Sequence, residues 1–145
     1  SDVCSSDLLN NPEKLFSSYR ALSTAINTGV VKTAHDCSEG GVGVALAEMC
    51  IGGRIGADID LDGTGNCDAF ARLWGESLGR IIIAVSKDNQ SEFLQIMAGH
   101  KITLLGEVKQ SEKLTINDGF ETLVACNVED LVSSWKGTLD MTGAI

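Results

Sequence analysis

The feature that most constrains the fold is residues 30–48, where a short apolar run leads through a polar, glycine-rich turn into a second apolar segment. Residues 30–34 favour a strand, and the residues from Val44 onward have helical spacing. Ser38 is a candidate N-cap for that helix. The first backbone N–H groups of a helix have no partner within it, and the helix dipole adds partial positive charge there. The stretch is therefore typical of an anion-binding turn.

The glycines and one carboxylate in this stretch indicate what the turn could hold. Gly40, Gly41 and Gly43 each cost a helix about 1 kcal/mol relative to Ala, so their presence requires a reason. Close approach of either a ligand or a packed backbone would supply it. Asp36 ends the strand with a hard carboxylate, which Mg²⁺ accepts beside phosphate oxygens. Two interpretations stay open. In the first, Asp36 and the turn that begins at Ser38 form a phosphate or metal site. In the second, the turn has a purely structural role.

A second informative segment spans residues 74–80, Trp-Gly-Glu-Ser-Leu-Gly-Arg. It precedes a continuous apolar run at 81–85, which is typical of a central strand covered on both faces. Glu76, Ser77 and Arg80 therefore lie near the N-terminal end of that strand. Either Glu76 and Arg80 simply pair with each other, or Glu76 and Ser77 contact a hydroxyl or phosphate group of a ligand.

Composition excludes several classes of partner. The chain has 11 basic and 20 acidic residues and a formal net charge of -9, which argues against nucleic acid and anionic membranes. No apolar run reaches the roughly 20 residues that span a membrane. The cysteines are dispersed without a C-x-x-C pair, which argues against a zinc site and favours reduced thiols in the cytoplasm. We interpret Cys37 as a packing residue. The five cysteines are Cys4, Cys37, Cys50, Cys67 and Cys126.

The remaining sequence predicts alternating helices and strands. Asn11 and Pro12 open a helix that Gly29 closes. The helix after the glycine-rich turn is expected to run to about residue 50, and further helices are expected at 66–74, 90–98 and 128–135. Further strands are expected at 55–61, 101–108, 113–116 and 121–125, and Asn117-Asp118-Gly119 predicts a hairpin between the last two. We expect an α/β (α+β) fold, a layered sandwich with a mixed β-sheet flanked by helices. Residues 1–8 resemble the translation of a sequencing adapter, so we expect a non-native leader there and a single domain over 9–145.

Two motifs in this order carry a resemblance to a known family. Residues 33–41, running into the apolar segment at 44–48, resemble the H-D-x-S-[DE]-G-G motif of the C-terminal domain shared by the aminoimidazole ribonucleotide synthetase superfamily. Residues 75–81 resemble its second signature, G-E-S-x-x-R. Together with residues 105–108 and 135–137, the chain is most similar to the phosphoribosylformylglycinamidine synthase family, in its synthetase subunit. The similarity covers nearly everything after Leu8, with Val42 in place of the usual Leu.

The resemblance implies a fold like that of the C-terminal domain of aminoimidazole ribonucleotide synthetase. It also implies a fragment of an enzyme that uses ATP, Mg²⁺ and glutamine-derived ammonia to convert formylglycinamide ribonucleotide into its amidine in purine biosynthesis. The implied partners are the remaining domains of the same synthetase chain and a glutaminase domain or subunit. The catalytic His and most ATP contacts of the family lie in other domains, so the resemblance implies no catalytic residue here and a chain that is inactive alone.

The resemblance also implies roles for particular residues. In the long, single-chain members the Asp and Ser of the first motif bind Mg²⁺ and nucleotide at a noncatalytic auxiliary site. This assigns the metal to Asp36 and the nucleotide, ATP or ADP, to Ser38 and the adjoining Gly40 and Gly41. By positional analogy alone, the resemblance implies that Glu76 and Ser77 contact the substrate.

Two alternatives to this function stay open. The short, multi-subunit members of the family are not expected to bind nucleotide in this half. The chain would then be a structural repeat domain that binds no ligand. Alternatively, it is the same domain of a superfamily paralogue, such as aminoimidazole ribonucleotide synthetase or selenophosphate synthetase.

Overall fold

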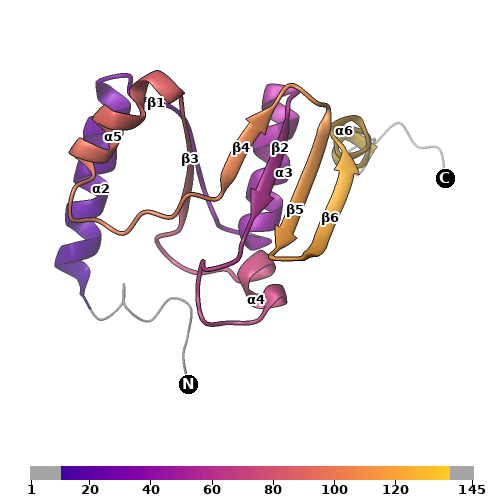
Figure 1. The fold of residues 1–145 in the computed structure, drawn as a ribbon, viewed down its shortest axis with the longest axis horizontal. Helices are drawn as coiled ribbons and strands as arrows, with labels where there is room; N and C mark the ends of the chain where they lie inside the picture. Colours follow the sequence, from indigo (N-terminus) through magenta and orange to yellow (C-terminus); the bar gives the residue numbers. More distant parts are fainter. Residues whose placement is uncertain (1–10, 138–145) are drawn as a thin grey trace. The chain divides into compact units, whose positions relative to one another are not determined.

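The computed structural model describes residues 11–137, so the leader expected at residues 1–8 lies outside the described part. Figure 1 shows an α+β chain with helices and a mixed sheet, which confirms the predicted fold class. The elements are, in chain order, α2 (Pro12–Asn27), β1 (Val31–Asp36), α3 (Gly41–Gly53), β2 (Gly56–Asp60), α4 (Ala69–Trp74), β3 (Ile81–Val85), the 3₁₀ turn η1 (Lys87–Asn89), α5 (Gln90–Ile96), β4 (Gly106–Lys109), β5 (Lys113–Asp118), β6 (Glu121–Asn127) and α6 (Val128–Gly137).

Contacts along the chain divide it into two compact units, and the boundary falls inside α3. The first unit holds the described residues up to Ala45 together with Asn66–Leu104, and the second holds Leu46–Gly65 together with the described residues from Leu105 onward. In the described part of the chain, no helix is both long and apolar enough to cross a membrane.

The first unit packs α2 and α5 against a two-stranded antiparallel sheet of β1 and β3. Asn11 caps α2 as predicted, because its side-chain oxygen accepts the N–H of Lys14 at 3.0 Å. Five buried residues form the core, and the partly buried Ile83 and Val85 of β3 pack against them. These five are Ala25, Val30, Val31, Phe93 and Met97.

The prediction that residues 81–85 form a central strand was wrong. Among the described strands β3 pairs with β1 alone, and only Ile82 of its five residues is buried. The strand is apolar for a different reason. Its side chains point alternately to the two faces of the sheet, and Ile83 and Val85 pack against the core that α2 and α5 form.

The second unit contains a four-stranded sheet in the order β4-β2-β5-β6, in which β2 and β5 are parallel and the other pairs are antiparallel. The predicted hairpin at residues 117–119 is confirmed between β5 and β6. The strand predicted over 101–108 is reduced to Gly106–Lys109. The physical reason is that β2 ends at Asp60, whose N–H bonds the carbonyl of Leu105, so residues 101–104 have no neighbouring strand to pair with.

The Asp60 carboxylate, at the end of β2, accepts a hydrogen bond from this hairpin. We therefore expect the stability of the unit to depend on pH. One carboxylate oxygen accepts the N–H groups of Asp62 at 2.9 Å and Gly119 at 3.0 Å, and these bonds lower the pKa of Asp60. The carboxylate therefore stabilises the fold above the unfolded pKa of about 3.9, and the contribution is lost as the pH falls through the lower folded pKa.

We expect Asp60→Asn to weaken the pH dependence of stability between pH 7 and about pH 3, measured as the urea midpoint at each pH. Asp58→Asn, at an exposed position two residues earlier in β2, is the control and should retain the wild-type dependence. Equal pH dependence in wild type and Asp60→Asn would show that these hydrogen bonds do not stabilise the fold.

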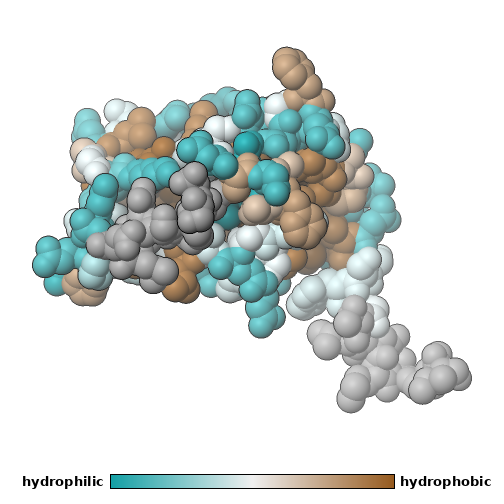
Figure 2. All heavy atoms as spheres, turned by 90° about the horizontal axis from the view of Figure 1, so that it is seen from below, coloured by the Kyte–Doolittle hydropathy of each residue, from teal (hydrophilic) through white to brown (hydrophobic). Residues whose placement is uncertain are grey.

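Figure 2 shows hydrophobic residues reaching the surface in several places among hydrophilic ones. The most exposed large apolar side chains are Phe70, Leu78, Leu104 and Phe120. Isolated exposed apolar residues of this kind are common on folded proteins and assign no function by themselves.

Candidate functional site

The two sequence motifs lie side by side in the first unit. Strands β1 and β3 are antiparallel, with Asp36 opposite Ile81, so the end of β1 adjoins the start of β3. The backbone N–H of Cys37 then bonds the carbonyl of Arg80 at 2.9 Å. The glycine turn follows β1 directly and the Glu-Ser segment precedes β3 directly, so this single strand pairing brings both motifs to the same end of the sheet.

The glycine turn is closed by hydrogen bonds within the chain. Gly40 and Gly41 have φ of 76° and 62°, a left-handed backbone that glycine adopts without strain. The N–H of Gly40 donates to Oε1 of Glu76 at 2.9 Å, and the N–H of Gly41 donates to the backbone carbonyl of Ser38 at 3.1 Å. The predicted N-cap is therefore replaced: Ser38 accepts through its carbonyl, and the distant Glu76 carboxylate accepts the N–H just before α3.

Packing explains the small residues at the start of α3. A Cβ on Gly41 would lie 2.8 Å from the carbonyl oxygen of Gly75 and 2.8 Å from the carbonyl carbon of Trp74. A Cβ on Gly43 would lie 2.7 Å from the indole of Trp74. The close approach that these glycines permit is thus made by the chain's own second motif.

The suggested pairing of Glu76 with Arg80 was wrong. The Glu76 carboxylate accepts from Gly40, whereas the Arg80 guanidinium donates to the carbonyls of Gly75 and Arg72, each at 3.3 Å. Arg80 thereby satisfies carbonyl groups at the C-terminal end of α4, a role typical of a cation at a helix C-terminus.

A pocket of about 420 Å³ lies between the motifs. Among the described residues that line it, three are carboxylates and Arg80 is the only basic one. The pocket is therefore acidic and favours either a cation or an anion that binds together with a cation. Tyr19 of α2 also lines it, a position that no local sequence pattern indicates. The polar and charged lining residues are Tyr19, Asp36, Ser38, Glu39, Glu76, Ser77 and Arg80.

The thiol of Cys37 is a poor nucleophile in this pocket. Its side chain is buried, and burial raises the pKa of Cys37, with the nearby Arg80 lowering it less and Asp36 adding to the rise. This confirms the interpretation of Cys37 as a packing residue. Cys50 and Cys126 are also free thiols.

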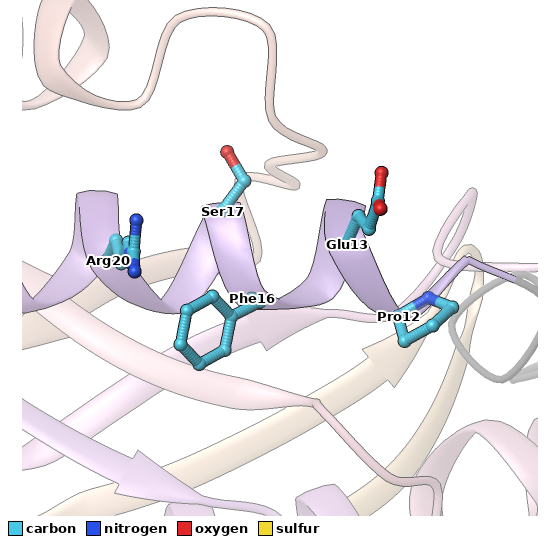
Figure 3. Close-up of a pocket in the computed structure, with 5 residues that line it drawn as sticks. All are labelled: Pro12, Glu13, Phe16, Ser17 and Arg20. Atoms are coloured by element: carbon cyan, nitrogen blue, oxygen red, sulfur yellow. The ribbon is translucent and has the colours of Figure 1, made fainter.

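A second pocket lies on α2 and has fewer groups that could bind a ligand. Figure 3 shows its five lining residues, all from one helix face: Pro12, Glu13, Phe16, Ser17 and Arg20. The Arg20 guanidinium lies 4.6 Å from the centroid of the Phe16 ring, which is a cation–π contact. None of the predicted site residues lies there.

The fold and the adjoining motifs define an α+β domain with a glycine-rich turn between a strand and a helix. The sequence profile of the AIR synthase related protein C-terminal domain matches residues 5–119, and the chain belongs to this family.

Solved structures share the fold. The Thermotoga maritima PurL chain complexed with FGAR matches with 22% identity and a TM-score of 0.72, over 81% of this chain and 21% of that one. The same protein complexed with ATP matches with 23% identity and a TM-score of 0.71, over 80% and 21%. A chain of a HypE-HypF complex matches with 21% identity and a TM-score of 0.55, over 83% and 40%. The chain thus spans about a fifth of the length of the PurL chains.

Proposed function

We propose that this chain is the C-terminal domain of a phosphoribosylformylglycinamidine synthase and that its inter-motif pocket binds a Mg-nucleotide through the phosphates. The observation that carries the proposal is the antiparallel pairing of β1 with β3, which brings both motifs to one pocket. Family membership supports it, as does the shared fold of T. maritima PurL, whose structures contain ATP, ADP and FGAR.

The residues of the pocket fit a metal-bound phosphate better than a bare metal ion. Asp36 is exposed at the end of β1 and offers one hard carboxylate to Mg²⁺. No group of three His, Cys, Asp or Glu able to hold a metal occurs among the described residues, so phosphate oxygens and water must complete the coordination. Ser38 and Ser77 line the pocket and would contact the phosphate. Gly40 and Gly41 are not among the described lining residues, and their N–H groups would contact the phosphate only in place of their present acceptors.

The activity of the whole enzyme belongs to a longer assembly. In it, ATP supplies the phosphoryl group that activates the amide oxygen before ammonia displaces phosphate, as in an ATP-dependent C–N ligase. We propose the remaining domains of the synthetase and a glutaminase domain or subunit as partners, in the cytoplasm. This chain alone is expected to be inactive, and Glu76 and Ser77 are only positional analogues of substrate contacts.

A second candidate role, a structural domain without ligand, is favoured by one observation. The Cβ position of Gly41 is filled by the backbone of Trp74 and Gly75, so packing alone accounts for a glycine there. The same domain of a paralogue, such as aminoimidazole ribonucleotide synthetase or selenophosphate synthetase, fits the family equally well.

Calorimetric titration of Mg-ADP and Mg-ATP into the 145-residue chain separates these roles. We expect micromolar binding that falls at least about tenfold in Asp36→Ala, because the variant loses its charge-assisted metal contact. Asp58→Ala, which removes an exposed carboxylate in the second unit, is the matched control and should bind like wild type. Absence of binding by a folded wild-type chain, or equal loss in both variants, would contradict the nucleotide site.

A further inference from the structure

The N–H groups that would hold a phosphate already have acceptors within the protein. Gly40 N–H donates to Glu76 Oε1 at 2.9 Å, and Gly41 N–H donates to the carbonyl of Ser38 at 3.1 Å. Glu76 reaches Gly40 from 36 residues away, because the β1–β3 pairing brings the two segments together. A side-chain carboxylate therefore lies where an anion is expected just before a helix.

A carboxylate and a phosphate compete for such a position. Both are anionic oxygen acceptors, and a single N–H group cannot make a full hydrogen bond to both at once. The Glu76 charge also adds to those of Asp36 and Glu39 in the pocket lining, whereas the Arg80 guanidinium is engaged with two backbone carbonyls. An entering phosphate must therefore displace Glu76 and overcome an acidic surround.

We propose that Glu76 is a specificity-determining residue, an internal carboxylate that competes with the incoming phosphate for Gly40 N–H. The pocket then selects a phosphate that arrives with a divalent cation, because the cation offsets the carboxylates that remain around it. The proposal rests on the proposed nucleotide site and gives Glu76 a role other than substrate contact.

The test uses calorimetric titration of Mg-ADP into the 145-residue chain and two variants. Glu76→Gln keeps the size of the side chain and an oxygen acceptor but removes the charge, and we expect about tenfold tighter binding. Glu39→Gln removes one charge from the same pocket lining without touching the bond to Gly40, so its gain in affinity should be no more than about twofold. Unchanged or weaker binding by Glu76→Gln, or an equal gain in Glu39→Gln, overturns the proposal.

A second measurement follows the Gly40 amide by two-dimensional NMR without nucleotide. Its resonance should shift far more in Glu76→Gln than in Glu39→Gln, because Glu39 precedes Gly40 in the chain but only the first variant alters the acceptor of the amide. An unmoved Gly40 amide in Glu76→Gln overturns the proposal whatever the nucleotide does.

The combined outcomes separate this proposal from the one on which it rests. Wild-type binding that Asp36→Ala removes, without a gain in Glu76→Gln, leaves the nucleotide site standing and overturns the role of Glu76. Wild-type binding that Asp36→Ala weakens and Glu76→Gln tightens supports both proposals. Absence of binding in every variant overturns both.

Discussion

Gly41→Ala should destabilise the protein by about 2–5 kcal/mol, measured as the free energy of unfolding in urea. Two costs add at this position. The backbone has φ of 62°, which disfavours any residue with a Cβ. The new Cβ would also lie 2.8 Å from the backbone of Trp74 and Gly75, and backbone atoms cannot rotate away as a flexible side chain can.

Gly52→Ala, in the same helix α3, is the matched control. No atom lies within 4 Å of its Cβ position, and alanine is the better helix former, so the variant should gain up to about 1 kcal/mol. A neutral Gly41→Ala would mean that the two motifs do not pack as described.

Phe93→Ala should cost about 3–5 kcal/mol, because the ring is 5% exposed in the core of the first unit. The truncation removes contacts with the core that α2 and β1 share and leaves a cavity that its neighbours fill incompletely. Unfolding in urea, followed by far-ultraviolet circular dichroism, measures the difference.

Leu94→Ala provides the comparison on the same helix turn. Leu94 is 51% exposed, so its removal should change the free energy of unfolding by no more than about 0.5 kcal/mol. Similar losses in the two variants would show that α5 does not bury the face described.

The elements with strong local signals were predictable from sequence. Asn11-Pro12 marked the start of α2, and Asn117-Asp118-Gly119 marked the β5–β6 hairpin, because caps and tight turns depend on residues close together in the chain. The extra length predicted for β4 failed because a strand needs a partner, and the short extent of β2 decides where pairing stops.

The candidate site was predictable only in its parts. Asp36 and the glycines were found from a local pattern, and Glu76 from another, but their meeting depends on the antiparallel pairing of β1 with β3. Pairing partners are a long-range property that local spacing does not specify, which is why the Gly40–Glu76 bond and the place of Tyr19 in the pocket were missed. The prediction that residues 81–85 form a central strand failed for the same reason. Half-buried edge strands and central strands can have the same composition, and only the pairing partners distinguish them.

The most direct test of the nucleotide site is to follow the backbone amides of the 145-residue chain by two-dimensional NMR while Mg-ADP is added. We expect the largest shifts within residues 36–41 and 75–80, with the Gly40 amide among them. Shifts confined to the second unit, or none at nucleotide concentrations far above micromolar, would contradict it.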